Sequence, residues 1–227
     1  MDIKSQNHNI LKGYNMLLYF AGSMIMYEPT EECIIDFWRN GILNRLPVAS
    51  LNPNFIKAAS QLKDSCEDKT LCTKMLREDY NRLFTLPDLA LALAYESVYP
   101  VNRQLNSVQH ISTVTEFYNS YGWESKFKGK ISDDHLGIEL LFLTILLEKY
   151  QVLDDEACSG EMRKEIRRFI DLHILSWIPE WNKKMQEHSG TLCYKGISTL
   201  IYACIEDIYA LMENDPSMAS HTDYLRN

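Results

Sequence analysis

An aspartate and a histidine stand side by side at Asp134 and His135, and Glu139 follows one helical turn later. An Asp-His pair is an arrangement that can move a proton. The same residues also suit a helix start, since carboxylates in the first turn offset the helix dipole, and a histidine pairs readily with a glutamate four residues on. Both a reactive site and a structural helix start are therefore open at this point.

The sequence lacks the motifs of the common helical enzymes. It contains no Glu-x-x-His or His-Glu-x-x-His for metals, no Gly-x-Ser-x-Gly elbow and no Gly-x-Gly-x-x-Gly fingerprint. The segment from Gly122 to Lys130 has the wrong spacing for a phosphate loop. We therefore expect no enzyme, cofactor or metal site, and keep a small-molecule hydrolase using Asp134 and His135 only as a remote alternative.

A second unusual stretch, Arg77 to Pro100, is rich in aromatic residues and includes the break in the helical pattern between Pro87 and Pro100. Its aromatic side chains are Tyr80, Phe84, Tyr95 and Tyr99, and Glu96 lies among them. Core packing is one explanation. An aromatic connection of this kind is also typical of a wall that binds a peptide.

The composition is that of a globular domain, with 46% hydrophobic and 24% charged residues in 227. A formal charge of −8 argues against nucleic-acid binding and favours basic partners. Its apolar runs, such as Met16 to Met26 and Leu140 to Leu147, do not read as a signal peptide or a membrane span. The six cysteines are far apart without zinc-like spacing, so we expect reduced thiols in a reducing compartment.

Apolar residues recur three and four apart nearly everywhere, which predicts an all-α protein of about nine or ten helices. Asn52 followed by Pro53 is a clear helix start. Residues Asp88 to Tyr99 fit either a short helix or an irregular connection. The expected helices are Ser5 to Met26, Glu31 to Asn40, Asn54 to Ser65, Thr70 to Leu83, Val101 to Tyr121, Asp134 to Gln151, Glu156 to Ile174, Ser176 to Glu187 and Leu192 to Glu213.

The chain shows no internal repeat and no long linker, which favours a single helical-bundle domain over residues 1–227. The loop at 122–131 is the one plausible hinge, so two copies could exchange helices there. We expect a monomer or a helix-swapped dimer.

Five elements in order resemble the TorD/DmsD/NarJ family of chaperones for complex redox enzymes. They are Tyr80-Asn81-Arg82-Leu83-Phe84, Tyr95-Glu96-Ser97-Val98-Tyr99, Phe117-Tyr118 through Gly122, Asp134-His135 with Glu139-Leu140, and Trp177-Ile178-Pro179-Glu180-Trp181. The chain departs from the family pattern at Leu86-Pro87, Leu93-Ala94 and Asp133, where the family often has Gly-Pro, Pro-Pro and a proline. These departures lie on the expected binding face and point to a client that is not a standard one.

The resemblance implies a cytoplasmic, TorD-like chaperone. Its partner would be the catalytic subunit of a molybdopterin oxidoreductase, and it would bind the twin-arginine signal peptide or the apo form of that subunit. Such binding assists cofactor insertion and prevents premature export. An alternative from the same family is a NarJ-type assembly chaperone of a redox enzyme that is not exported. Nucleic-acid binding and membrane insertion are not expected.

A signal peptide with two arginines beside an apolar run needs carboxylates bordering an aromatic or aliphatic groove. We expect His135 to pair with Glu139 or Asp134 and to leave a carboxylate turned toward that groove. The predicted peptide-binding residues are Tyr80, Phe84, Tyr95, Glu96, Tyr99, Asp134, His135, Leu136 and Glu139.

Overall fold

A computed structural model describes residues 3–32, 46–65, 69–85, 90–99 and 107–213. Within these residues the protein is all-α, with eight α-helices against the nine or ten expected and no named strand. Most of the predicted helix from Glu31 to Asn40 lies in 33–45, outside the described residues. The α-helices are α1 (Ile3–Met26), α3 (Pro53–Lys63), α4 (Lys69–Tyr80), α5 (Ser107–Ser120), α6 (Leu136–Gln151), α7 (Glu156–Ile170), α8 (Ile178–His188) and α9 (Leu192–Glu213).

Two helices end differently from the prediction, and one starts differently. The chain leaves α4 at Tyr80 as a wider π-helical turn, Asn81–Thr85, and it leaves α7 as another, Asp171–Leu175. Helix α6 begins at Leu136, because His135 has the extended backbone of an N-cap. The connection predicted as a short helix or irregular segment contains one 3-10 turn, Glu96–Val98.

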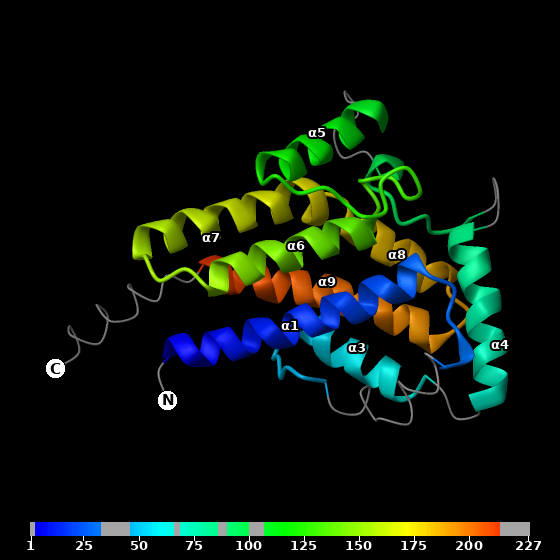
Figure 1. Cartoon of the computed structure of the whole chain (residues 1–227). Coiled ribbons are helices and arrows are strands. Elements are labelled where there is room, and N and C mark those ends of the chain that lie inside the picture. Colours follow the sequence, from blue (N-terminus) through cyan, green and yellow to red (C-terminus); the bar gives the residue numbers. More distant parts are fainter. Residues whose placement is uncertain (1–2, 33–45, 66–68, 86–89, 100–106, 214–227) are drawn as a thin grey trace.

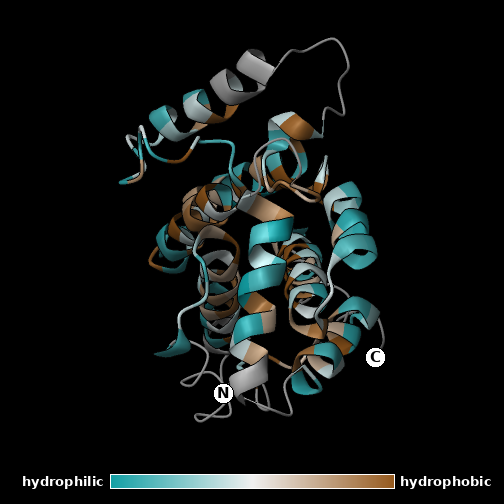
Figure 2. Ribbon diagram, turned by 90° about the vertical axis from the view of Figure 1, so that its right-hand side faces the viewer, coloured by the Kyte–Doolittle hydropathy of each residue, from teal (hydrophilic) through white to brown (hydrophobic). Residues whose placement is uncertain are grey.

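Helices α1, α6, α7 and α9 lie side by side along the length of the molecule (Figure 1). Helix α9 packs against α1, α3, α7 and α8, and nearly every side of it is apolar, which places it at the centre of the core. Helix α4 stands steeply across one end of these four helices (Figure 1). Helix α5 crosses above the four helices in the same view. In the turned view, hydrophilic residues lie largely on the outer helix faces (Figure 2).

Helix α3 starts as its sequence predicts. The side chain of Asn52 accepts a hydrogen bond of 2.9 Å from the backbone N–H of Asn54, and Pro53 occupies the first turn. The amide of Asn52 also donates to the carboxylates of Glu206 and Asp207 on α9, each over 3.0 Å. One capping residue therefore starts α3 and fixes it against α9.

Helix α5 is held to the bundle by aromatic packing. Phe117 and Tyr118 contact Phe142 on α6 and Phe169 on α7, and the Tyr118 and Phe142 ring centroids are 4.6 Å apart. The Tyr118 hydroxyl donates to the Asp133 carbonyl over 2.9 Å, just before α6. These contacts tie α5 to the segment that carries Asp134 and His135.

Of the cysteines in the described residues, Cys72 is disulfide-bonded, whereas Cys158, Cys193 and Cys204 are free. The expectation of reduced thiols is wrong for Cys72, because spacing along the chain does not show which cysteines the fold brings together. Within the described part of the chain no helix combines the length and apolar character of a membrane span. The extent of the domain over residues 1–227 and the hinge at 122–131 stay predictions.

Candidate functional site

The head of α6 is built by the backbone and side chain of His135. Its Nδ1 accepts a hydrogen bond of 3.0 Å from the N–H of Gly137, so the imidazole acts as the helix N-cap. Burial lowers the pKa of His135 to about 4. The ring is therefore neutral at neutral pH, which agrees with Nδ1 accepting a hydrogen bond.

The connection at 90–99 is joined to this helix start by backbone hydrogen bonds. The N–H of Leu136 donates to the Ala94 carbonyl over 2.8 Å, and the N–H of Glu96 donates to the Asp134 carbonyl over 2.9 Å. The carboxylate of Asp134 accepts a further bond of 3.1 Å from the N–H of Ser97. The two stretches that stood out in the sequence are thus direct neighbours.

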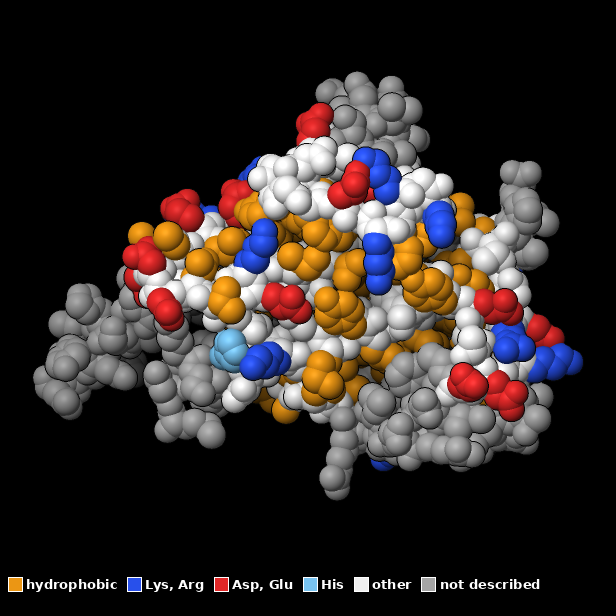
Figure 3. All heavy atoms as spheres, viewed as in Figure 1, with side chains coloured by type: hydrophobic (Ala, Val, Ile, Leu, Met, Phe, Trp, Pro, Cys, Tyr) orange, Lys and Arg blue, Asp and Glu red, His pale blue; other side chains and the backbone are white. Residues whose placement is uncertain are grey.

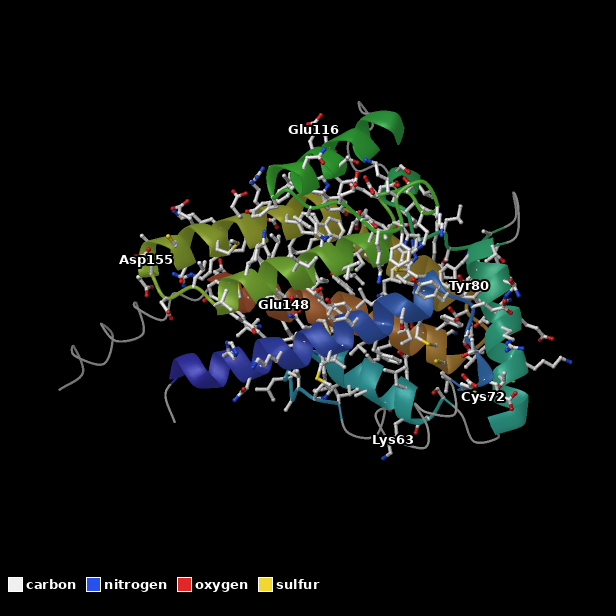
Figure 4. All side chains as sticks on the ribbon, in the orientation of Figure 1. Lys63, Cys72, Tyr80, Glu116, Glu148 and Asp155 are labelled. Atoms are coloured by element: carbon white, nitrogen blue, oxygen red, sulfur yellow. The ribbon has the colours of Figure 1, made fainter. Side chains whose placement is uncertain are left out.

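Four rings from three segments gather near this junction, and we call Tyr80, Phe84, Tyr95 and His135 the aromatic wall. The Tyr95 ring meets His135 edge-on with centroids 4.8 Å apart, and Tyr80 meets Phe84 at 5.3 Å. Burial raises the pKa of Tyr80 to about 12, with smaller contributions from Glu28 and Tyr95. Tyr80 ends α4 close to the ends of α1 and α6 (Figure 4). Phe84 and Tyr95 are half-buried, so their rings remain partly accessible.

The three predicted carboxylates lie together but not on the surface. Glu96 is 4% exposed, and Asp134 and Glu139 are fully buried. The expected pairing of His135 with Glu139 or Asp134 is not formed, because the imidazole is used as the helix cap and packs on Tyr95. In this conformation none of the three carboxylates reaches a groove.

Glu139 is the most enclosed of these groups. Its carboxyl oxygens make no well-formed hydrogen bond within the described part of the chain, although Glu96 and the Trp177 indole are near enough to affect its pKa. Burial first, and then the charges of Glu96 and Asp134, raise the pKa of Glu139 well above its usual range. Enclosure in the interior therefore favours the protonated, uncharged form of this side chain.

Sequence reasoning missed the main partner of Glu96. His173, in the turn after α7, places Nδ1 3.1 Å from the Glu96 carboxylate, and both side chains are buried. The indole of Trp177 donates to the His173 carbonyl over 2.6 Å, and that of Trp181 donates to the Ala92 carbonyl over 3.1 Å. The available signal was a histidine flanked by Leu172 and Ile174, four residues before the predicted tryptophan element.

Tyr99 and Leu136, also predicted to contact a peptide, face the interior. Tyr99 stacks on Trp177 with ring centroids 5.4 Å apart, and Leu136 is fully buried. Both residues position the connection and α6 rather than presenting a surface in this structure.

One exposed carboxylate borders the aromatic wall and was not predicted. Glu28 follows α1, contributes to the raised pKa of Tyr80, and makes a long, exposed ion pair of 4.0 Å with Arg77 of α4. Arg77 also donates to the Pro29 carbonyl over 3.0 Å, which holds it near this turn. Glu28 therefore offers an accessible negative charge beside Tyr80.

A family model described as the nitrate reductase delta subunit matches residues 49–183, which is more than half of the chain. The chain belongs to this family. The matched range contains the connection at 90–99, the head of α6 and the Trp177–Trp181 turn, so it includes the junction just described. The resemblance to the TorD/NarJ family found in the sequence is confirmed.

Several curated relatives carry the name chaperone protein TorD. The one from Histophilus somni is 31% identical over 56% of this chain and 59% of its own length. The one from Actinobacillus pleuropneumoniae serotype 3 is 29% identical over 58% and 60%. A longer match, to the protein of Vibrio cholerae strain O395, is 26% identical over 84% and 87%. The chain thus spans about three fifths of the length of the first two relatives and most of the third.

The TorD/NarJ assignment also bears on the remote hydrolase alternative. The relatives are named as chaperones, in agreement with the expectation that this chain is not an enzyme. Among the described residues no cluster of His, Cys, Asp and Glu is arranged to hold a metal ion. Asp134 and His135 are already engaged in building the junction.

Proposed function

We propose that this protein is a cytoplasmic maturation chaperone that binds the twin-arginine signal peptide, or the apo form, of a molybdopterin oxidoreductase catalytic subunit. Binding would hold the client back from export until its cofactor is inserted. The observation that carries this proposal is membership of the TorD/NarJ family over residues that include the junction of the 90–99 connection with α6.

The aromatic wall supplies the apolar part of the proposed peptide site. Phe84 and Tyr95 are half-buried and offer ring surface, whereas Tyr80 is buried and contacts Phe84 edge-on. A rigid, partly exposed aromatic surface binds apolar side chains at low cost in conformational entropy. In this arrangement Asp134 and His135 act by positioning Tyr95, through the backbone bonds of the connection and through ring packing.

Glu28 is the group we propose for an arginine of the peptide. The Glu28–Arg77 pair is long and exposed, and such surface pairs contribute only about 0–1 kcal/mol. An incoming guanidinium would compete with Arg77 for this carboxylate. One charge-assisted contact of about 1.5–3 kcal/mol and an apolar patch form a large part of the about 8 kcal/mol that micromolar binding needs.

A NarJ-type chaperone, which assembles a redox enzyme that stays inside the cell, is the second candidate. It is favoured by the matching family description, which names a nitrate reductase subunit. The two candidates differ in their need for paired arginines. Such a chaperone would bind its client without them.

Calorimetric titration with a synthetic twin-arginine signal peptide tests the proposal. We expect binding that weakens at least about tenfold when both arginines are replaced by alanine. Replacing Tyr95 by alanine should weaken binding by a similar factor. The control is Tyr202→Ala, which removes another half-buried tyrosine, from α9. Equal binding of the peptide with arginines and the peptide with alanines would favour the second candidate. No binding of either peptide would contradict the proposed signal-peptide function.

A further inference from the structure

A second apolar surface lies between α1 and α6. It is a groove with a volume of about 160 Å³, formed by the last turns of α1, the loop at 126–127 and the first turns of α6. Figure 3 looks onto this face and shows apolar side chains gathered over the two helices. The groove is lined by Leu18, Tyr19, Gly22, Ser23, Met26, Tyr27, Lys126, Phe127, Gly137, Leu140, Leu141 and Thr144.

Two glycines set the depth of this groove. A Cβ atom added to Gly137 would lie 2.3 Å from Cγ of Met26, so the Met26 side chain occupies the space beside this glycine. Gly22 faces α6 at the same place, where an added Cβ would contact Leu140 at 3.7 Å. The larger side chains of both helices form the two sides of the groove.

The groove continues as an exposed apolar row along α1. Met16 is 63% exposed, Tyr19 46% and Tyr27 49%, and their spacing places Met16, Tyr19 and Ser23 on one side of the helix. The opposite side of α1 is buried against α6 and α9. The row extends over about 16 Å, since eleven residues of helix rise about 1.5 Å each. Isolated exposed apolar side chains need no explanation, but three along one side of a helix and the turn after it, bordering a groove, are typical of an interaction surface.

The lining of the groove carries a positive charge. Lys126 is the one charged residue among the described residues that line it, and it lies over the Phe127 ring at 5.2 Å. The same loop exposes Lys128, which pairs with Glu124, and Lys130. A segment that leaves the groove beside this loop would therefore be stabilised by carboxylates and opposed by arginines.

We propose that this groove binds an amphipathic helix of the client protein, with apolar side chains in the groove and carboxylates beside Lys126. A helix laid along the seam would insert one apolar row between α1 and α6, as helices do in helix-in-groove recognition. This contact rests on the proposed chaperone function but is separate from the aromatic wall. The groove would bind the body of the client, not the paired arginines of its signal peptide.

Fluorescence anisotropy of the full chain with a labelled synthetic helix of about 18 residues, about five turns, tests this inference. Two peptides share a leucine face and carry three glutamates, at the N-terminal end in one and at the C-terminal end in the other. Each has a matched peptide in which glutamine replaces the three glutamates. We expect at least one glutamate version to bind about tenfold more tightly than its glutamine match at low salt. A third peptide with serines on the apolar face should not bind.

Matched variants locate the contact. Tyr19→Glu places a charge in the groove and should weaken binding about tenfold or more. Ile56→Glu is the control, since Ile56 is 56% exposed on another helix, α3. Lys126→Glu should abolish the preference for glutamate, whereas Lys63→Glu, at the end of α3 and directed away from the bundle in Figure 4, should leave it unchanged.

The inference is overturned if no peptide binds, if glutamate and glutamine peptides bind equally, or if Tyr19→Glu and Ile56→Glu have the same effect. Thermal melting of each variant checks that its fold is intact. The twin-arginine titration remains a separate readout. Binding of that peptide with no binding of the amphipathic helices would reject the groove and leave the proposed function standing.

Discussion

The carboxylate of Glu96 lies 3.1 Å from Nδ1 of His173, and both side chains are buried. This contact fixes the connection at 90–99 to the turn between α7 and α8. Because Glu96 also pairs through its backbone with Asp134, one residue links three elements of the junction. The position of Tyr95 depends on these links.

Replacing Glu96 by alanine should destabilise the protein by about 1–3 kcal/mol, since the imidazole of His173 loses this partner in the interior. Glu96→Gln retains a side chain that can hydrogen-bond and should cost less. Urea unfolding at neutral pH measures both variants. Equal stability of Glu96→Ala and the unmodified protein would show that the contact contributes nothing to folding.

His135 should make the protein sensitive to mild acid. Its pKa is lowered from 6.5 to about 4 in the folded state, so the unfolded chain binds more protons between these values and stability falls as the pH drops through this range. The difference corresponds to about 3 kcal/mol at a pH below both values. His135→Asn retains an acceptor for the Gly137 N–H and should remove this part of the pH dependence. Chemical unfolding from pH 7 to pH 4 tests it, and an identical acid profile for the variant would contradict the assignment.

Glu139 should act in the opposite direction. Its pKa in the folded state is raised well above the ordinary value of 4.5, so its contribution to stability is complete below that value and is lost as the pH rises toward the raised pKa. Glu139→Gln imitates the neutral acid. We expect the variant to gain stability relative to the unmodified protein as the pH increases from 5 to 8.

The control for this measurement is Glu148→Gln, an exposed glutamate on the same helix (Figure 4). It should follow the unmodified protein at every pH. A Glu139→Gln curve that stays parallel to that of Glu148→Gln would mean that Glu139 is charged in the folded protein.

Helix positions were largely predictable because each depends on neighbours in the sequence. Leu192 to Glu213 was predicted with the bounds that the structure has, and the cap at Asn52 is formed as expected. The neighbourhood of the Tyr95 connection and the head of α6 was also anticipated, through the family resemblance. Periodicity could not give the π-helical turns after α4 and α7, since their residues continue an apolar helical pattern.

Burial of the carboxylates could not be predicted from the sequence. Acidic residues are seldom fully buried, which favoured an exposed site at Glu96, Asp134 and Glu139. The decisive contact joins Glu96 to a histidine 77 residues away, and no local pattern encodes such a pair. The α1–α6 groove was missed for a related reason. The two sides of the groove come from helices that lie more than a hundred residues apart in the chain.

Asp79 is another residue whose role depends on distant partners, and it yields the last prediction. Its buried carboxylate accepts bonds of 3.0 Å from the N–H groups of Gly190 and Thr191 and one of 2.7 Å from the Thr191 hydroxyl. It thereby satisfies backbone donors just before α9 and offers a negative charge to the positive end of that helix. Arg82 lies 2.6 Å from the same carboxylate and also donates to the His188 carbonyl over 2.7 Å.

Asp79→Ala removes the bonds to Gly190, Thr191 and Arg82 at once and leaves two backbone N–H groups without this acceptor, so we expect a loss of about 2–4 kcal/mol in unfolding free energy. Asp79→Asn retains one acceptor oxygen and should recover part of that loss. Glu78→Ala is the control, because that neighbouring side chain is exposed and pairs only weakly with Lys74 at 3.8 Å. Thermal and urea unfolding compare the three. Since α9 forms the centre of the core, a loss as small as that of Glu78→Ala would mean that packing alone fixes its start.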